Sequence, residues 1–308
     1  FYPGSLWYLY NLTEEEYWKS LAEKYTEALE KMQYNTSHHD VGFIIGCSYM
    51  NGIRMGGEEK YKPVVVQAAK SLSTRFRPVA GVIQSWNTQK GWQSERGWKC
   101  PVIIDNMMNL ELLFEATRLS GDSTFYNIAV SHADKTLKNH FRKDGSSYHV
   151  VDYDPETGEV RSRSTAQGYA DESAWARGQA WVIYGYTMCY RYTHNPAYLK
   201  QAERTYDFIF THTNMPEDLV PYWDYDALNI PNEPRDVSSA AITASALYEL
   251  SSATRYAGYK ETADLIMASL ASSAYRAELG DNQGFLLMHS VGSIPHGNEI
   301  DVPLNYAD

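Results

Sequence analysis

Acidic side chains recur along this chain at an almost constant interval. The aspartates that mark it, separated by 65, 66, 65 and 65 residues, are Asp40, Asp105, Asp171, Asp236 and Asp301. Each of the first four is followed by a run of small and apolar residues typical of a helix. Two carboxyl groups at one site, one protonated and one ionised, can carry out general acid/base catalysis on a sugar. The aspartates are therefore the first candidates for chemistry.

A structural role explains any one of these aspartates equally well. Asp is a preferred residue at the start of a helix, where its carboxylate accepts a backbone hydrogen bond and stabilises the helix by about 1 kcal/mol. Several carboxylates gathered at one place repel one another, however, and can hold one of them protonated near neutral pH. The spacing alone does not decide which pair is catalytic.

The repeat predicts a succession of helical hairpins. Residues 105–119 are apolar nearly all round, as expected of a helix buried on both sides, whereas residues 122–142 carry one apolar stripe, typical of a helix with a wet face. Asn195 followed by Pro196 is expected to open a later outer helix. A β-hairpin is expected around residues 154–158.

Six inner helices are expected, starting near residue 4 and at about residues 40, 105, 171, 236 and 301. With an outer helix after each, they predict an all-α fold, an (α/α)6 barrel, as a single catalytic domain over residues 1–308. In such a closed ring the inner helices begin on one face, around a funnel. A linear array of helical repeats needs a shorter period of about 34 residues. The ends lack an initiator Met and a helix stop, so we expect a piece of a longer protein, without part of the first and last repeats.

The composition limits the partners. A formal net charge of −11 disfavours nucleic acid and acidic membrane surfaces. No apolar run approaches the roughly 20 residues needed to cross a bilayer. The chain holds 25 Tyr and 8 Trp, flat rings with a polar edge that suit a groove for a polar, ring-shaped ligand.

Tryptophans cluster near two of the aspartates. Trp86, Trp92 and Trp98 lie in a loop ahead of Asp105, and a second group surrounds an arginine after Asp171. This group consists of Trp175, Arg177 and Trp181. Residues four apart on a helix share a face, so Arg177 and Trp181 can form a wall for a sugar that carries a carboxylate. Packing of Trp175 and Trp181 in the core explains them equally well.

Motifs for metal or cofactor chemistry are absent. His38 and His39, adjacent in the chain ahead of Asp40, cannot easily bind one ion from a helix start, and neither H-E-x-x-H nor C-x-x-C occurs. Nucleophile-elbow, P-loop and G-x-G-x-x-G sequences are absent as well. We therefore expect neither a metal nor a cofactor.

Six stretches spread over almost the whole chain form a further pattern. They are FYPGSLWYLYNLT, SHHDVGF, PVIIDNMMNLELLFEAT, QGYADESAWARGQAWVIYGYT, VPYWDY and HGNEIDVPLNYAD. In these stretches the sequence resembles glycoside hydrolase family 88, the unsaturated glucuronyl hydrolases, and the resemblance implies an (α/α)6 barrel. Family 105, the unsaturated rhamnogalacturonyl hydrolases, shares barrel and mechanism but reads closer to ARGNGW where this chain has ARGQAW.

The resemblance implies a hydration reaction. Such enzymes act on the unsaturated uronic acid that polysaccharide lyases leave at the non-reducing end, and add water across its C4=C5 double bond. The hemiketal then opens and the glycosidic link breaks. Carried over, Asp105 in the IIDN context donates the proton and helps activate water, and Asp40 in the HHD context keeps that proton in place by like-charge proximity. Asp171 then becomes a cap or a supporting group.

The resemblance also implies which residues hold the sugar and its carboxylate. They are His149, Gln167, Trp175, Arg177 and Trp181. Further residues that we expect to contact the substrate are His39, Trp86, Trp92, Ser290 and Ser293. Some family members bind a sulfated sugar through Ser-x-x-Ser-x-Lys; here Pro295 stands at the Lys position, so sulfate binding should be weak or differently built.

Other functions stay open. An epimerase or a conventional inverting glycosidase fits the same barrel, the latter with carboxyls about 6.5–9.5 Å apart. A carbohydrate-binding module would bind without turnover. The expected partner is an unsaturated uronyl oligosaccharide, for example from a glycosaminoglycan, bound by a monomer or homodimer without nucleic acid or membrane. The compartment, cytoplasmic or periplasmic, is left open.

Overall fold

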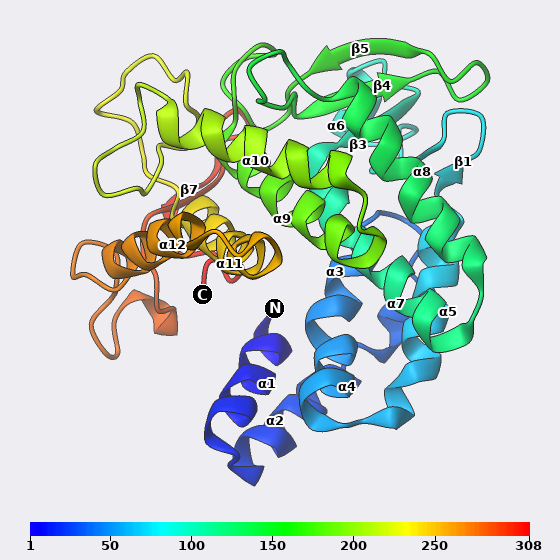
Figure 1. The fold of residues 1–308 in the computed structure, drawn as a ribbon, viewed down its shortest axis with the longest axis horizontal. Helices are drawn as coiled ribbons and strands as arrows, with labels where there is room; N and C mark the ends of the chain where they lie inside the picture. The colour runs from blue at the N-terminus through cyan, green and yellow to red at the C-terminus, as the bar shows by residue number, and fades with distance from the viewer. The chain divides into compact units, whose positions relative to one another are not determined.

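The computed structural model describes residues 1–308, and helices dominate the chain, as predicted (Figure 1). None of the helices combines the length and apolar character that crossing a membrane requires. The chain divides into two compact units. Unit 1 comprises Phe1–Val102, Met108–Lys135 and Asp152–Arg161, and unit 2 comprises Ile103–Met107, Thr136–Val151 and Ser162–Asp308.

The first half of the chain contains three strands and helices of at most 17 residues. In order, they are α1 (Tyr2–Thr13), α2 (Glu16–Glu27), η1 (Glu30–Tyr34), α3 (Val41–Ile45), a π-helical turn η2 (Gly46–Met50), α4 (Asn51–Gly56), η3 (Glu59–Tyr61), α5 (Lys62–Ser73), β1 (Phe76–Arg77), β2 (Val82–Ile83), α6 (Trp92–Glu95), β3 (Cys100–Ile103), the 3-10 helix η4 (Ile104–Asn109), α7 (Leu110–Ser120) and α8 (Ser123–Asn139).

The second half contains the longest helices. In order, its elements are β4 (Val150–Tyr153), β5 (Val160–Ser164), α9 (Ala176–Thr193), α10 (Pro196–Thr211), α11 (Val237–Thr254), α12 (Ala257–Leu270), η5 (Asn282–Gly284), β6 (Ser290–Ser293) and β7 (Asn298–Val302).

Unit 2 is built from two helical hairpins (Figure 1). Helix α9 packs against α10 and α11, and α11 packs against α12. Thirteen of the 18 residues of α9 are buried and ten of the 18 of α11, against five of 16 in α10 and four of 14 in α12. Buried helices therefore alternate with helices that bury one stripe, as the repeat predicts.

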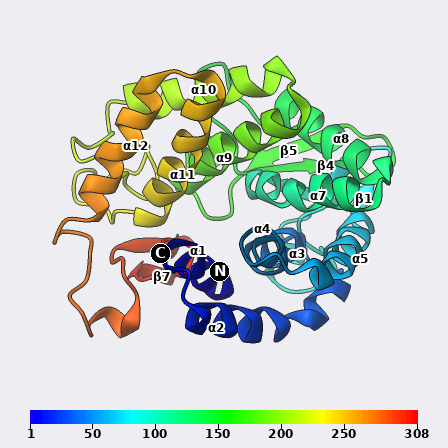
Figure 2. The same cartoon turned by 60° about the horizontal axis from the view of Figure 1, so that its bottom comes forward.

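Unit 1 contains a second set of packed helices (Figure 2). Helix α1 packs against α2 and α4, and α5 packs against α3 and α7. Residues 110–116 of α7 are all buried, and α8 buries a stripe that includes Phe125, Ile128, Ala129 and Ala133. The two predicted patterns for these helices are confirmed.

Short sheets connect the helices. Strands β1 and β2 form a hairpin, β3, β4 and β5 form a sheet in that order, and β6 pairs with β7. The expected turn between β4 and β5 is confirmed, because Gly158 N–H donates to Asp154 O at 2.8 Å. In the β6–β7 hairpin Val291 lies opposite Ile300, and Ser293 opposite Asn298.

Several predicted helix starts are confirmed. Helix α1 covers the expected first inner helix, and α3 begins directly after Asp40. Asp236 caps α11, with its carboxylate accepting from Ser238 N–H. Asn195 caps α10, and Pro196 takes the first helical position.

The helix starts predicted at about Asp105 and Asp171 are displaced along the chain for an α-helix, and the one predicted at Asp301 is wrong. Asp105 lies in the 3-10 helix η4, whose first N–H donates to His149 O, so the α-helix α7 starts only at residue 110. Asp171 precedes α9 by five residues, because the intervening N–H groups of residues 173 and 174 bond to Ala170 O and the Asp226 carboxylate. Asp301 lies in β7.

A close helix contact in unit 1 yields a stability prediction. A Cβ added at Gly42 in α3 would lie 2.7 Å from Asn109 Cβ, whereas one at Gly46 meets nothing nearer than 3.9 Å. We expect Gly42→Ala to lower the free energy of unfolding by about 1–3 kcal/mol through overpacking. Gly46→Ala should be neutral or stabilise by up to about 1 kcal/mol. Urea unfolding measures both, and equal values for the two variants would contradict the contact.

Candidate active site

The carboxyl group of Asp105 faces an imidazole in unit 2. Asp105 is 8% exposed, and its Oδ2 lies 3.7 Å from His149 Nε2. This distance exceeds that of a hydrogen bond. The backbone joins the two segments, since Ile104 N–H donates to His149 O at 2.9 Å. The structure thus brings two of the predicted site residues together in a buried setting.

Two backbone donors fix the protonation of the His149 ring. Its Nδ1 accepts from Ala166 N–H at 3.1 Å and from Gln167 N–H at 3.2 Å. A ring nitrogen that accepts hydrogen bonds carries no hydrogen, so the neutral ring holds its hydrogen on Nε2. His149 therefore presents an N–H donor on the side of Asp105.

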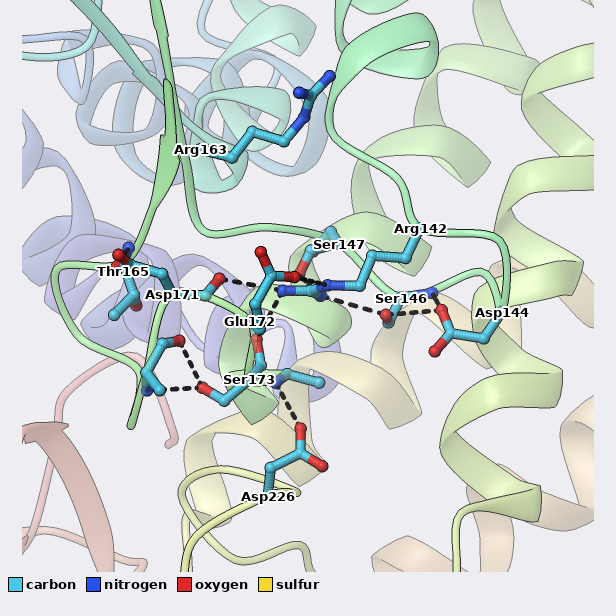
Figure 3. Close-up of polar contacts among 12 residues, drawn as sticks. Arg142, Asp144, Ser146, Ser147, Arg163, Thr165, Asp171, Glu172, Ser173 and Asp226 are labelled. Carbon is cyan, nitrogen blue, oxygen red and sulfur yellow. Dashed lines mark hydrogen bonds and ion pairs between the residues drawn. The ribbon is translucent and has the colours of Figure 1, made fainter. Parts of the chain in front are cut away.

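The donors to His149 lie on a loop at residues 165–175. Thr165 N–H donates to the Asp171 carboxylate at 2.8 Å, which closes the loop (Figure 3). The side chain of Gln167 donates to Gly292 O at 3.0 Å. A Cβ on Gly168 would lie 2.7 Å from Thr165 Oγ1, so any larger residue there would displace the Thr165 side chain. Asp171 is thus a loop-closing residue and not a helix cap.

Asp224 holds the same loop from a buried position. It is fully buried, and its carboxylate accepts from Tyr169 N–H at 2.8 Å, Ser173 Oγ at 2.7 Å and Asp226 N–H at 2.9 Å. Burial raises the pKa of Asp224 to about 6, although these three donors act in the opposite direction.

Arg177 is buried, and both of its terminal nitrogens donate hydrogen bonds. Nη1 donates to Asp236 Oδ2 at 2.9 Å and to Val291 O, and Nη2 donates to Gly292 O at 2.9 Å. The guanidinium stacks on the Trp175 ring at 4.6 Å. Asp236 therefore balances the charge of Arg177, and the guanidinium also bonds to the backbone of strand β6.

The two tryptophans of this region are both buried. Trp175 is 2% exposed, belongs to an apolar cluster with Trp223 and Val291, and lies 4.5 Å from the His149 ring. It precedes α9, although a helix starting at Asp171 would have contained it, and Trp181 follows Arg177 by one turn within α9 with 4% exposure. Both rings thus serve as packed walls of unit 2.

Strand β6 carries the two predicted serines. Ser290 is fully buried, and Ser293 Oγ lies 2.7 Å from His296 Nδ1. Gln167 and Arg177 both donate to the carbonyl of Gly292 between these serines. Unit 2 therefore gathers the two serines, Gln167 and Arg177 along one strand.

Tyr306 is a candidate that the sequence analysis missed. Its ring lies 5.3 Å from the Arg177 guanidinium. Burial raises the pKa of Tyr306 to about 12; Arg177 lowers it, and the charges of Asp236 and Asp105 raise it. Tyr306 lies in the stretch HGNEIDVPLNYAD, one of the six that carry the family resemblance, and this could have marked it as a site residue. No spacing rule links it to Asp105.

Asp40 lies in unit 1 between two histidines. Its Oδ1 is 3.3 Å from His39 Nε2 and its Oδ2 is 3.4 Å from His38 Nδ1. Burial raises the pKa of Asp40, but the charge of His39, the hydrogen bond and charge of His38 and the hydrogen bond of Asn109 outweigh it and lower the pKa to about 2. Asp40 is therefore a carboxylate at neutral pH. His39 itself is 1% exposed.

The loop tryptophans of unit 1 form one aromatic cluster. Trp86 stacks on Trp98 with centroids 5.8 Å apart, and Trp92 meets both rings edge-on at 5.1 and 5.9 Å. Trp92 is 37% exposed, while Trp98 is buried. The cluster therefore offers one accessible indole supported by two others. No group of three or more His, Cys, Asp or Glu side chains is arranged to hold a metal ion.

A helical protein with a buried carboxyl facing an imidazole, which itself lies against a tryptophan ring, has the features of a carbohydrate-active hydrolase. Comparison with known proteins identifies the family. The model of Glycosyl Hydrolase Family 88 matches residues 1–286. This chain belongs to glycoside hydrolase family 88, which confirms the resemblance.

Relatives and solved structures agree with this assignment. An unsaturated glucuronyl hydrolase of Formosa agariphila is 46% identical over the whole chain, which spans 76% of that relative. A crystal structure of an unsaturated glucuronyl hydrolase specific for heparin superposes with a TM-score of 0.94 at 44% identity, covering 99% of this chain and 81% of that one. The structure of the unsaturated glucuronyl hydrolase from Bacillus sp. GL1, responsible for the degradation of glycosaminoglycan, superposes with a TM-score of 0.89 at 30% identity. The match covers 99% of this chain and 81% of that one.

The buried ion pair of Arg177 and Asp236 predicts that replacing Asp236 destabilises the protein far more than replacing an exposed aspartate. Asp236→Asn leaves the buried guanidinium without its countercharge, and we expect it to lower the free energy of unfolding by about 3–5 kcal/mol. Asp264→Asn, which removes the exposed pair with Lys260 on α12, should cost at most about 1 kcal/mol. Denaturant unfolding of both variants tests this, and similar losses would refute the buried pair.

Asp224 predicts a pH dependence of stability. An unfolded Asp titrates near 3.9, so the raised native pKa contributes stability that is complete below about pH 4 and lost as the pH rises through about 6. As the pH rises from 4 to 7, the free energy of unfolding of wild type should fall by about 3 kcal/mol relative to that of Asp224→Asn. Urea unfolding at several pH values measures this change. Asp207→Asn, at an exposed carboxyl on α10, is the control, and a pH-independent difference for Asp224→Asn would contradict the raised pKa.

Proposed function

We propose that this chain is an unsaturated glucuronyl hydrolase that hydrates the C4=C5 double bond of the unsaturated uronic acid at the non-reducing end of lyase products. The observation that carries the proposal is the 46% identity, over the whole chain, to a relative of that name. The two units together form a single (α/α)6 catalytic domain in this proposal. The alternation of buried and half-buried helices supports it.

In the proposed reaction Asp105 is the general acid and base. It gives a proton to C4 of the enol ether while water adds to C5, and the water loses a proton to the resulting carboxylate. The C5 hemiketal opens by breaking its bond to the ring oxygen, and the C1 hemiacetal then releases the next sugar. One water molecule is consumed and the acid is regenerated.

Asp40 has a different part in this proposal. Because its pKa is lowered to about 2, Asp40 cannot deliver a proton at neutral pH. A carboxylate raises the proton affinity of a second carboxyl near it. We assign to Asp40 the task of keeping Asp105 protonated until the substrate is bound, with His39 holding the Asp40 carboxylate.

The remaining site residues bind the sugar. His149 offers its Nε2–H, Gln167 its amide, and the exposed indole of Trp92, supported by Trp86, offers a ring face for a sugar. Trp175 and Trp181 form the packed wall. Since Arg177 is engaged with Asp236 and β6, it contributes by holding the strand that carries Ser290 and Ser293.

A purified enzyme tests the proposal by loss of the near-ultraviolet absorbance of the conjugated uronate. We expect turnover of at least one lyase product of heparin, chondroitin, hyaluronan, gellan or pectin, and none of saturated glycosides. Asp105→Asn should reduce kcat by about 10²- to 10⁴-fold with binding and melting temperature retained, because it removes the acid.

Asp264→Asn, which alters an exposed carboxyl on α12, is the matched control and should keep full activity. Near-normal kcat in Asp105→Asn would refute the assignment of the acid. Turnover of saturated glycosides would instead favour a conventional glycosidase, and binding without turnover a carbohydrate-binding module.

A further inference from the structure

Arg142 joins two segments of unit 2 that are far apart in sequence (Figure 3). Its Nη1 donates to Ser147 O at 2.9 Å and Ser146 Oγ at 3.2 Å, within the turn that leads to His149. Its Nη2 donates to Ser173 O at 3.0 Å and Asp171 O at 3.2 Å, on the loop at residues 165–175. One side chain therefore fixes the distance between the turn and the loop.

The contacts of Arg142 require a guanidinium. Nη1 meets two acceptors on the turn and Nη2 meets two on the loop. The centroid of the Tyr148 ring lies 3.9 Å from Cζ. The ammonium of a lysine is a compact point charge that cannot reach both sides at once. The Arg142 side chain is only 14% exposed, so water does not readily replace these contacts.

The two segments that Arg142 joins meet again at His149. The turn continues through Tyr148 into His149 itself. The loop is closed by the Asp171 carboxylate on Thr165 N–H, and the next two N–H groups, of Ala166 and Gln167, point at His149 Nδ1. A shift of the loop against the turn would therefore pull the backbone donors away from the ring.

Two backbone donors at 3.1 and 3.2 Å form geometrically sensitive hydrogen bonds. Without them, neutral imidazole exchanges its hydrogen between Nδ1 and Nε2, and the ring no longer always presents Nε2–H toward Asp105. The buried Asp224 anchors the loop on Tyr169 N–H, but it makes no contact with the turn at residues 142–148. At the end of the loop, Gln179 Nε2 donates to Trp175 O at 3.1 Å and to Ser147 O of the turn at 3.3 Å. Arg142 makes the side-chain link from the turn to residues 171 and 173 of the loop.

From these contacts we infer that Arg142 is a positioning residue for the reaction: by holding the loop at residues 165–175 against the turn before His149, it fixes His149 as the Nε2–H tautomer. The inference rests on the function proposed above for its effect on turnover. The effect on the tautomer is independent of that function.

The test compares Arg142→Lys with Arg163→Lys. Arg163 lies over the same Tyr148 ring at 5.5 Å but donates to Asn139 O and not to the loop, so it is a matched control. In ¹⁵N-histidine-labelled protein, His149 should show the Nε2–H pattern in wild type and Arg163→Lys, and a mixture of tautomers in Arg142→Lys. A His149→Gln spectrum assigns the signal among the nine histidines.

Turnover gives the second measurement. We expect kcat/KM of Arg142→Lys to fall about 10- to 100-fold with KM raised, because a misplaced His149 no longer holds the sugar in position. An unchanged tautomer in a folded Arg142→Lys overturns the inference. If wild type bleaches no lyase product, the proposed function fails, and the tautomer alone still decides the role of Arg142.

A second variant keeps the test valid if Arg142→Lys does not fold. Arg142→Gln leaves no buried charge unpaired, and its shorter amide side chain cannot contact both the turn and the loop. We expect the same mixture of His149 tautomers and a loss of kcat/KM in the same direction. A retained Nε2–H pattern in this folded variant would overturn the inference.

Discussion

The acceptor side of one imidazole ring determines the arrangement of the candidate site in unit 2. His149 Nδ1 is held by two backbone N–H groups, so its other nitrogen must carry the hydrogen. Backbone donors can converge on a side chain only where the chain turns tightly, which explains the closure of the loop by Asp171 and the glycine at position 168. The loop geometry is thus a consequence of the ring that it must hold.

Burial of charge explains why equally spaced aspartates have different roles. Asp236 pairs with a buried arginine, since an unpaired guanidinium in the interior would be costly, and it also caps α11. Asp171 accepts a backbone hydrogen bond in a loop, and Asp301 pairs with His289 at the surface. Only Asp40 and Asp236 directly precede an α-helix, so the interval alone does not assign a role, and each carboxylate takes its role from its partners.

Much of the fold was predictable because helix periodicity is a local property. The buried and half-buried helices, the capped starts of α10 and α11 and the hairpin between β4 and β5 follow from neighbouring residues. The start of α9 could not be predicted, because the N–H groups of residues 174 and 176 bond to residues about 50 positions away. In the site, the motifs predicted His149 and Gln167, but Arg142 and Tyr306 depend on partners that no spacing reveals.

The pairing of Arg177 has a consequence for recognition of an anionic sugar. The protein carries a formal net charge of −11, and the buried guanidinium of Arg177 is balanced by Asp236. Long-range attraction therefore contributes little to binding a uronate. In the proposed reaction the carboxylate of the uronate must be held by short-range donors such as His149 Nε2–H and side-chain amides or hydroxyls. Such donors act only at hydrogen-bond distance, so substrate binding depends on how firmly the loop and β6 are held in place.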